Sequence, residues 1–125
     1  MGHLREANVG IDLVAAVLDD DLVTCLMLQH VLETEGFEVK CFSAPAEFLK
    51  YMKRNRPACV LLDVNMPDMN GLQVLSRLAL MESKTPVIVI SAEDDMTNAR
   101  TALNYGASSF IRKPVDPGRL LRRIR

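Results

Sequence analysis

The chain has 125 residues, of which a quarter are charged and about half are apolar, and its formal net charge is −1. This size fits one globular domain with its own core, and the near-neutral charge gives no support to a nucleic-acid-binding or membrane-surface protein. No apolar run approaches the roughly 20 residues of a membrane span. Residues 1–12 are polar, lack a signal-peptide pattern, and are predicted to be a disordered leader or a cloning remnant.

From residue 13 to residue 125, apolar runs typical of strands alternate with helical patterns. The predicted strands are 13–18, 37–42, 58–62, 86–90 and 108–111, and the predicted helices are 22–36, 45–55, 72–81, 96–106 and 117–125. Strands that are apolar on both faces and separated by helices indicate a parallel sheet covered on both sides. We therefore expect a flavodoxin-like, doubly wound (βα)5 three-layer α/β sandwich with strand order 2-1-3-4-5. The last predicted helix reaches the chain end, which favours a domain cut from a longer protein.

Polar residues follow four of the five predicted strands directly. They are Asp19, Asp20 and Asp21 after the first strand, Asp63 after the third, Ser91 after the fourth and Lys113 after the fifth. Because parallel strands end along one edge, where ligands bind, these side chains are expected to meet there. Carboxylates with room for water and phosphate suit Mg²⁺. A carboxylate beside Mg²⁺, a hydroxyl and an ammonium can accept a phosphoryl group.

Each polar segment taken alone also has a more ordinary interpretation. The three aspartates could cap the first helix, and "SAED" at 91–94 fits a capping box. The segment 65–71 could be a plain turn, and Lys113 could be a solvated charge. Their joint placement at one sheet edge favours the phospho-acceptor site.

Four segments together resemble the signatures of the bacterial response-regulator receiver domain of two-component systems. They are "VLDDD", "LLDVNMPDMNG", "VIVISAEDD" and "FIRKP", and the resemblance covers residues 13–125. It implies that Asp63 is the phospho-acceptor and a Mg²⁺ ligand. It implies further that Asp20 binds Mg²⁺ directly, Asp19 through water, and Asn65 through its backbone carbonyl.

The resemblance also implies the parts of a switch. Ser91 takes the place of the hydroxyl that bonds the phosphoryl group, Lys113 is the lysine of the site, and the bond from Lys113 to Pro114 is expected to be cis. Phe110 occupies the position of an aromatic residue that turns inward on activation. Asn65 and Glu93 occupy the positions that tune hydrolysis.

By this resemblance the domain is a cytoplasmic signalling module rather than an enzyme. Its phosphodonor is a sensor histidine kinase or a phosphotransfer protein. Helix 96–106, strand 108–111 and helix 117–125 form the face that contacts an output domain or effector outside this chain, or a second copy in a homodimer. Two alternatives remain: an interaction module of the same fold that takes no phosphate, and a haloacid-dehalogenase-like phosphotransferase, which would need an acid where Asn65 stands.

Other residues are expected to be structural. Cys25, Cys41 and Cys59 are far apart among apolar neighbours and are predicted to be buried free thiols of a reducing compartment. Leu22 and Leu26 are predicted core residues, with donor docking as the alternative. His30 and the basic segment 112–125 are predicted to face solvent, without direct contact to nucleic acid.

Overall fold

The computed structural model describes residues 13–64, 71–91 and 96–124. Strands and helices alternate along these residues. The strands are β1 (Val14–Leu18), β2 (Glu38–Phe42), β3 (Cys59–Asp63), β4 (Val87–Ser91) and β5 (Ser109–Arg112). The helices are α2 (Leu22–Thr34), α3 (Pro45–Arg54), α4 (Gly71–Leu80), α5 (Met96–Asn104) and α6 (Pro117–Ile124). None of these described helices is long and apolar enough to cross a lipid bilayer.

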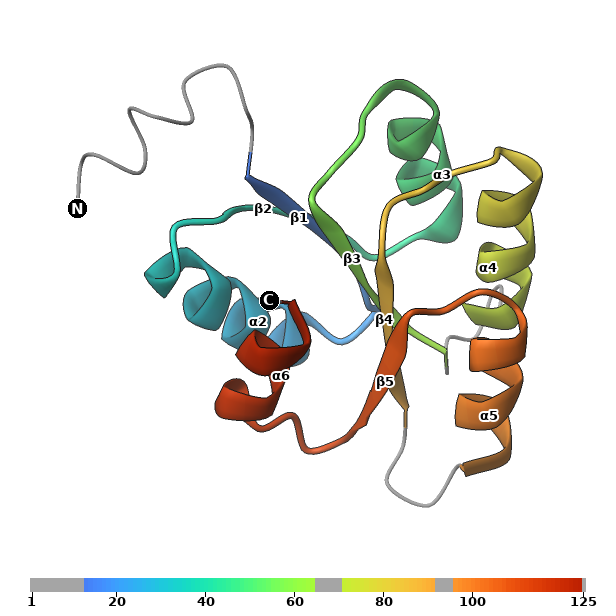
Figure 1. Ribbon diagram of the computed structural model, residues 1–125. Coiled ribbons are helices and arrows are strands. Elements are labelled where there is room, and N and C mark those ends of the chain that lie inside the picture. The colour runs from blue at the N-terminus through green and yellow to red at the C-terminus, as the bar shows by residue number, and fades with distance from the viewer. Residues whose placement is uncertain (1–12, 65–70, 92–95, 125) are drawn as a thin grey trace.

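The five strands form one parallel sheet in the order β2-β1-β3-β4-β5 (Figure 1). Every residue of β1, β3 and β4 is buried, whereas β2 lies at an edge and its residues are exposed or half-buried. The strands that are apolar on both faces therefore occupy the centre of the sheet, where both faces are covered. The predicted flavodoxin-like fold and its strand order are confirmed.

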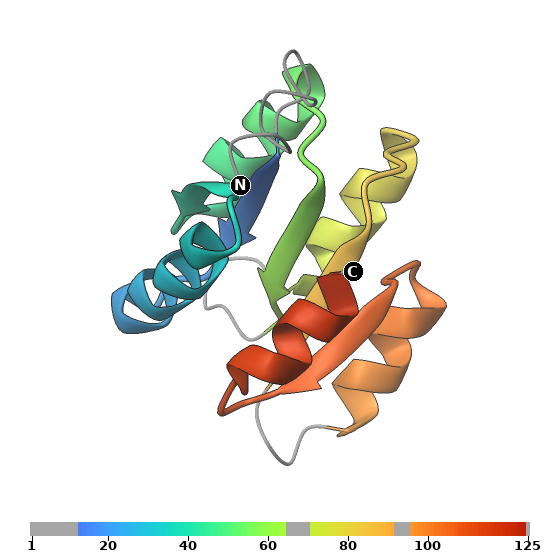
Figure 2. The same cartoon turned by 60° about the vertical axis from the view of Figure 1, so that its left-hand side comes forward.

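Helices cover both faces of the sheet, and each face has its own apolar core. Helices α3, α4 and α5 lie on one face and helices α2 and α6 on the other (Figures 1 and 2). Alternate residues of β1 point to opposite faces, so Ala16 and Leu18 pack with Phe48 of α3, while Ala15 and Val17 pack with the α2 side. The three layers hold the carboxyl ends of the strands in a fixed arrangement.

The start and end of α2 follow from local chemistry. The carboxylate of Asp21 accepts hydrogen bonds from the Val23 N–H at 3.0 Å and from the Thr24 hydroxyl at 2.9 Å, which makes Asp21 the N-cap. Beyond the helix, Gly36 adopts φ 91°, a conformation that glycine reaches at little cost. Of the three consecutive aspartates, only Asp21 is the N-cap of this helix.

Two expectations about buried side chains were wrong. Leu22 and Leu26 are 70% and 56% exposed, because α2 turns Cys25, Leu28 and Leu32 toward the sheet instead. Cys41 is exposed rather than buried, because the β2 strand that carries it lies at the sheet edge.

The other predictions of this kind agree with the structure. Cys25 and Cys59 are buried, all three cysteines are free thiols, and His30 is exposed. The predicted leader, residues 1–12, lies outside the described residues.

Candidate functional site

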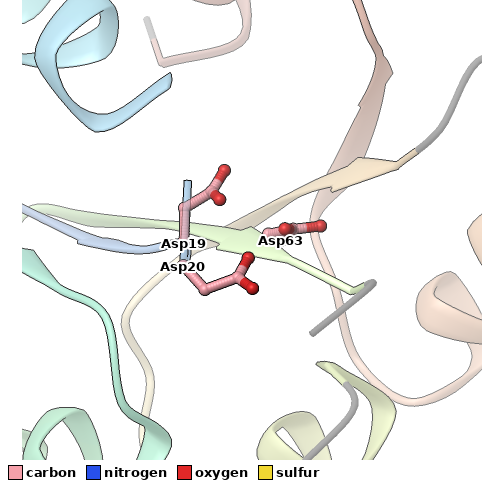
Figure 3. A group of neighbouring side chains, drawn as sticks. All are labelled: Asp19, Asp20 and Asp63. Atoms are coloured by element: carbon pink, nitrogen blue, oxygen red, sulfur yellow. The ribbon is translucent and has the colours of Figure 1, made fainter. Parts of the chain in front are cut away.

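The carboxyl ends of β1 and β3 bring three acidic side chains together. Asp63 is the last residue of β3, and Asp19 and Asp20 follow β1, its neighbour in the sheet. One carboxylate oxygen from each of the three residues lies within 4.8 Å of the other two (Figure 3). Asp19 is 1% and Asp63 2% exposed, whereas Asp20 is exposed. The cluster thus has a buried base and one carboxylate open to solvent.

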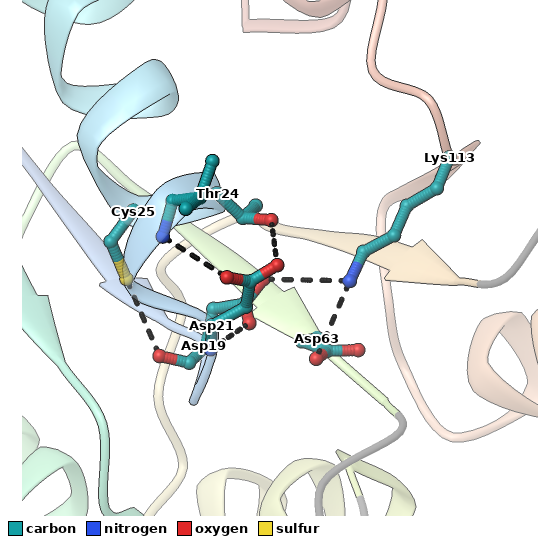
Figure 4. Close-up of polar contacts among 7 residues, drawn as sticks. Asp19, Asp21, Thr24, Cys25, Asp63 and Lys113 are labelled. Atoms are coloured by element: carbon teal, nitrogen blue, oxygen red, sulfur yellow. Dashed lines mark hydrogen bonds and ion pairs between the residues drawn. The ribbon is translucent and has the colours of Figure 1, made fainter.

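Lys113 reaches this cluster from the end of β5. Its Nζ lies 3.8 Å from Asp19 Oδ2 and 3.7 Å from Asp63 Oδ2 (Figure 4). The backbone N–H of Lys113 donates a 2.8 Å hydrogen bond to the Ser91 carbonyl, and the peptide bond from Lys113 to Pro114 is cis. Because the described site holds three carboxylates and one ammonium, which pairs with Asp19 and Asp63, it carries excess negative charge, which attracts a cation.

Hydrogen bonds hold both the backbone and the side chain of Asp19. Its N–H donates to the Phe42 carbonyl at 3.0 Å, its carbonyl accepts from the Cys25 thiol at 3.3 Å, and its Oδ1 accepts from the Asp21 N–H at 2.8 Å. Burial raises the pKa of Asp19 to about 6, and the negative charge of Asp63 adds to the rise. The Asp21 N–H and Lys113 act in the opposite direction. A nearby cation would favour the charged form of this acid.

Two buried polar atoms of this edge have no hydrogen-bond partner among the described residues, Asp19 Oδ2 and Ser91 Oγ. Leaving a buried polar group without a partner is costly, and such groups often mark ligand sites. Ser91 is the last residue of β4, and α5 is described from Met96. The capping-box interpretation rests on residues 92–94, which lie outside the described residues, so it stays untested.

The missing partner of Ser91 predicts an unusual response to substitution. We expect Ser91→Ala to leave the free energy of unfolding unchanged or slightly raised, because the variant removes a buried hydroxyl that forms no hydrogen bond within residues 13–64, 71–91 and 96–124. Urea unfolding followed by circular dichroism measures this. A loss of more than about 2 kcal/mol would contradict the prediction, because it would mean that the hydroxyl has a structural partner.

The donor set fits a hard divalent cation. Carboxylate oxygens from Asp19, Asp20 and Asp63 are the ligands that Mg²⁺ prefers, and Asp19 Oδ2 accepts no hydrogen bond from the part of the chain that the structure describes. Of the residues that the resemblance assigned, Asn65 and Glu93 lie outside the described residues. Phe110 is half-buried and packs against the core beneath α3, α4 and α5. Their roles stay predictions.

Two residues that support the site were not recognised in the sequence. The Cys25 thiol donates a hydrogen bond to the backbone carbonyl of Asp19, a contact that no local sequence pattern predicts. The N–H of Gly71 donates to the Val64 carbonyl at 3.1 Å, and a Cβ at Gly71 would lie 2.5 Å from the Val64 Cα. The only sequence signal was a glycine after a turn, which did not reveal the close approach of α4 to the end of β3.

Known proteins share both the sequence pattern and the fold. A model of the response regulator receiver domain matches residues 15–125. The response regulator protein TodT of Pseudomonas putida is 37% identical over 112 residues, which are 90% of this chain and 49% of TodT. The transcriptional regulatory protein PrrA of Mycobacterium tuberculosis is 34% identical over 109 residues, 87% of this chain and 47% of PrrA.

Solved structures agree with these relatives. The crystal structure of FixJ-N has a TM-score of 0.85 at 30% identity and covers 90% of each chain. Full-length FixJ from B. japonicum has a TM-score of 0.84 at 31% identity, and the match covers 89% of this chain and 55% of FixJ. The chain spans about half the length of the curated relatives named here. The match to the family model covers nearly all of the chain, which therefore belongs to the response regulator receiver domain family.

Proposed function

We propose that this domain accepts a phosphoryl group on Asp63, in the presence of Mg²⁺, and passes the signal to an output surface. The observation that carries the proposal is the surroundings of Asp63. This buried carboxylate lies within 4.8 Å of two further carboxylates and 3.7 Å from the Lys113 ammonium. A nucleophilic carboxylate with cationic neighbours is suited to phosphoryl transfer.

The proposed reaction moves one phosphoryl group from a phosphohistidine to Asp63. A carboxylate oxygen of Asp63 attacks the phosphorus, the P–N bond breaks, and its electron pair stays on the imidazole nitrogen. No general base is needed, because the attacking carboxylate has no proton to lose. Lys113 balances charge beside Asp63, and the Ser91 hydroxyl donates a hydrogen bond to a phosphoryl oxygen. Mg²⁺, held by Asp19, Asp20 and Asp63, would supply further neutralisation of the phosphoryl oxygens.

Attack of water on the acyl phosphate returns Asp63 to its carboxylate form and releases inorganic phosphate. The domain thus catalyses only its own phosphorylation and dephosphorylation, and we propose that it is a signalling module rather than an enzyme with a turned-over substrate. Asn65 and Glu93 would orient the attacking water and set the lifetime of the phosphoryl group.

The donor is proposed to be a sensor histidine kinase or a phosphotransfer protein in the cytoplasm. Leu22, Val23 and Leu26 of α2 are 70%, 74% and 56% exposed, and α2 begins next to the acidic cluster. Exposed apolar side chains of this kind are typical of protein-binding surfaces. A helical donor protein that docks on these three residues would bring its phosphohistidine close to Asp63.

The output surface is proposed to be the face formed by α5, β5 and α6. Strands β4 and β5 are neighbours, so Ser91 and Phe110 lie on adjacent strands. Movement of Ser91 toward the phosphoryl group would let Phe110 change rotamer and alter this face, a two-state switch driven by local charge. Its partner would be an output domain or effector, or a second copy of the chain. Relatives about twice as long, among them a transcriptional regulatory protein, support an output domain outside this chain.

Intact-protein mass spectrometry tests phosphorylation directly. After incubation with Mg²⁺ and acetyl phosphate, the parent chain is expected to gain one phosphoryl group, and Asp63→Asn is expected to gain none. Omission of Mg²⁺ in the presence of EDTA should prevent the gain in the parent. If a phosphohistidine protein also fails to phosphorylate the parent under conditions where Mg²⁺ binds, the proposal is wrong and the fold serves only as a binding surface.

A further inference from the structure

We propose that Cys25 and Cys41 form a redox-modification site. Their two thiols would oxidise to a disulfide next to Asp19 of the acidic cluster. Cys25 lies on α2 and Cys41 on the edge strand β2, and these two elements pack against each other. The Cys41 Sγ is 3.9 Å from the Cys25 carbonyl oxygen, so the thiol of Cys41 points at the helix turn that carries Cys25. The two cysteines therefore belong to neighbouring elements that pack together, and not to distant parts of the fold.

The two cysteines also belong to the same face of the sheet. Val17, the β1 partner of Cys41, packs with Cys25 on the α2 side, and paired residues of neighbouring strands point to the same face. The Cys25 thiol donates to the Asp19 carbonyl and the Cys41 thiol donates to the carbonyl of Cys25 itself, so both thiols lie at the first turns of α2. A disulfide requires rotation of these side chains to the sulfur–sulfur bond length of about 2.05 Å.

Exposure separates the roles of the two thiols. Cys41 is exposed and Cys25 is 5% exposed, so Cys41 meets a small-molecule disulfide first. Its thiolate attacks one sulfur of that disulfide and displaces a thiolate, which leaves with the electron pair. The Cys25 thiolate then attacks the Cys41 sulfur and displaces the second small thiolate. Two electrons pass from the protein to the oxidant, and the two thiol protons pass to the released thiolates.

Oxidation would alter the support of Asp19. The Cys25 thiol donates a hydrogen bond to the Asp19 carbonyl (Figure 4), and a disulfide sulfur has no hydrogen to donate. The Asp19 N–H is bonded to the carbonyl of Phe42, the residue after Cys41, so the new covalent link joins both segments that hold Asp19. This expectation rests on the proposed function: the oxidised form should bind Mg²⁺ at least about threefold more weakly than the reduced form, because it has lost a weak hydrogen bond to Asp19.

Oxidation of the full chain with glutathione disulfide at mildly alkaline pH tests the site. Intact mass should fall by two hydrogen atoms, peptide mapping should show Cys25 linked to Cys41, and dithiothreitol should reverse both changes. Cys59→Ala is the matched control and should still form the link, because Cys59 lies on β3 and is 3% exposed. Cys41→Ser, an exposed substitution that spares the core, should not form it.

The outcomes separate the site from the signalling proposal. A lasting glutathione adduct on Cys41, or recovery of all thiols in the reduced form, would overturn the disulfide. If the link forms but reduced and oxidised chains bind Mg²⁺ equally in calorimetry, the coupling to Asp19 is wrong and the modification site stands. If the reduced chain gains no phosphoryl group, the proposed function fails, while the peptide map still decides whether the thiols pair.

Discussion

Gly71→Ala should lower the free energy of unfolding by roughly 3 kcal/mol, the upper end for overpacking a tight contact. A Cβ at this position would lie 2.5 Å from the Cα and 2.6 Å from the Cγ1 of Val64. Because one of these atoms is backbone, no rotation of a side chain relieves the clash, and the start of α4 must move away from β3. Val64 follows Asp63 directly, so we also expect slower phosphorylation by acetyl phosphate.

Two other glycines separate steric from conformational effects. At Gly118 in α6 the nearest atoms to an added Cβ are 3.6 and 3.7 Å away, so Gly118→Ala should stabilise the domain by up to about 1 kcal/mol. Gly106 has φ +108° with nothing within 4 Å of an added Cβ, so Gly106→Ala should cost about 1 kcal/mol through backbone strain alone. Urea unfolding measures all three. A loss at Gly71 no larger than that at Gly106 would contradict the close approach to Val64.

Much of the fold could be predicted because the central strands are apolar on both faces, whereas the edge strand β2 is not. The runs that became β1, β3 and β4 are continuously apolar, which occurs only where helices cover both faces of a sheet. Parallel order then brings the ends of separate strands to one edge, so Asp19, Asp63 and Lys113 meet although they are far apart in the chain. The prediction of the site therefore depended on the topology of the sheet.

The details that failed depend on single-residue placement. Which of three consecutive aspartates caps α2 is decided by where β1 ends and the helix begins, a boundary that sequence patterns locate only within a residue or two. Helix α2 is apolar on more than one side, so periodicity could not tell Leu22 and Leu26 from the buried Leu28. The exposure of Cys41 follows from the edge position of β2, which is a property of the whole sheet.

Asp19→Asn should make the metal-free domain more stable by roughly 1–3 kcal/mol at pH 7.5, as an upward pKa shift of about two units implies. Burial raises the pKa of Asp19 from 3.8 to about 6, so the folded state binds this proton more tightly than the unfolded chain. The stability that the parent gains from the bound proton is complete below about pH 4 and is lost as pH rises through 6. Asparagine has no charge to bury, and its Oδ1 can still accept the hydrogen bond from the Asp21 N–H.

Urea unfolding in EDTA at pH 4.5, 6 and 7.5 measures this difference, which should be small at the lowest pH and largest at the highest. Asp21→Asn is the matched control. Hydrogen bonds from Thr24 and Val23 lower the pKa of Asp21. Its contribution to the free energy of unfolding is therefore present above about pH 4 and should not change across this pH range. A difference between parent and Asp19→Asn that does not vary with pH would mean that Asp19 does not titrate in this window.

Mg²⁺ should reduce the stability advantage of Asp19→Asn over the parent. At ten times its dissociation constant, a ligand of the folded state adds about 1.4 kcal/mol to the free energy of unfolding. The parent should gain this amount at pH 7.5, because its carboxylates at positions 19, 20 and 63 can act together as ligands. Asp19→Asn should gain clearly less at the same Mg²⁺ concentration, since one charged oxygen of the cluster is lost. Equal gains in both proteins would show that Asp19 contributes nothing to cation binding, and the cation would then be held by the other ligands of the site.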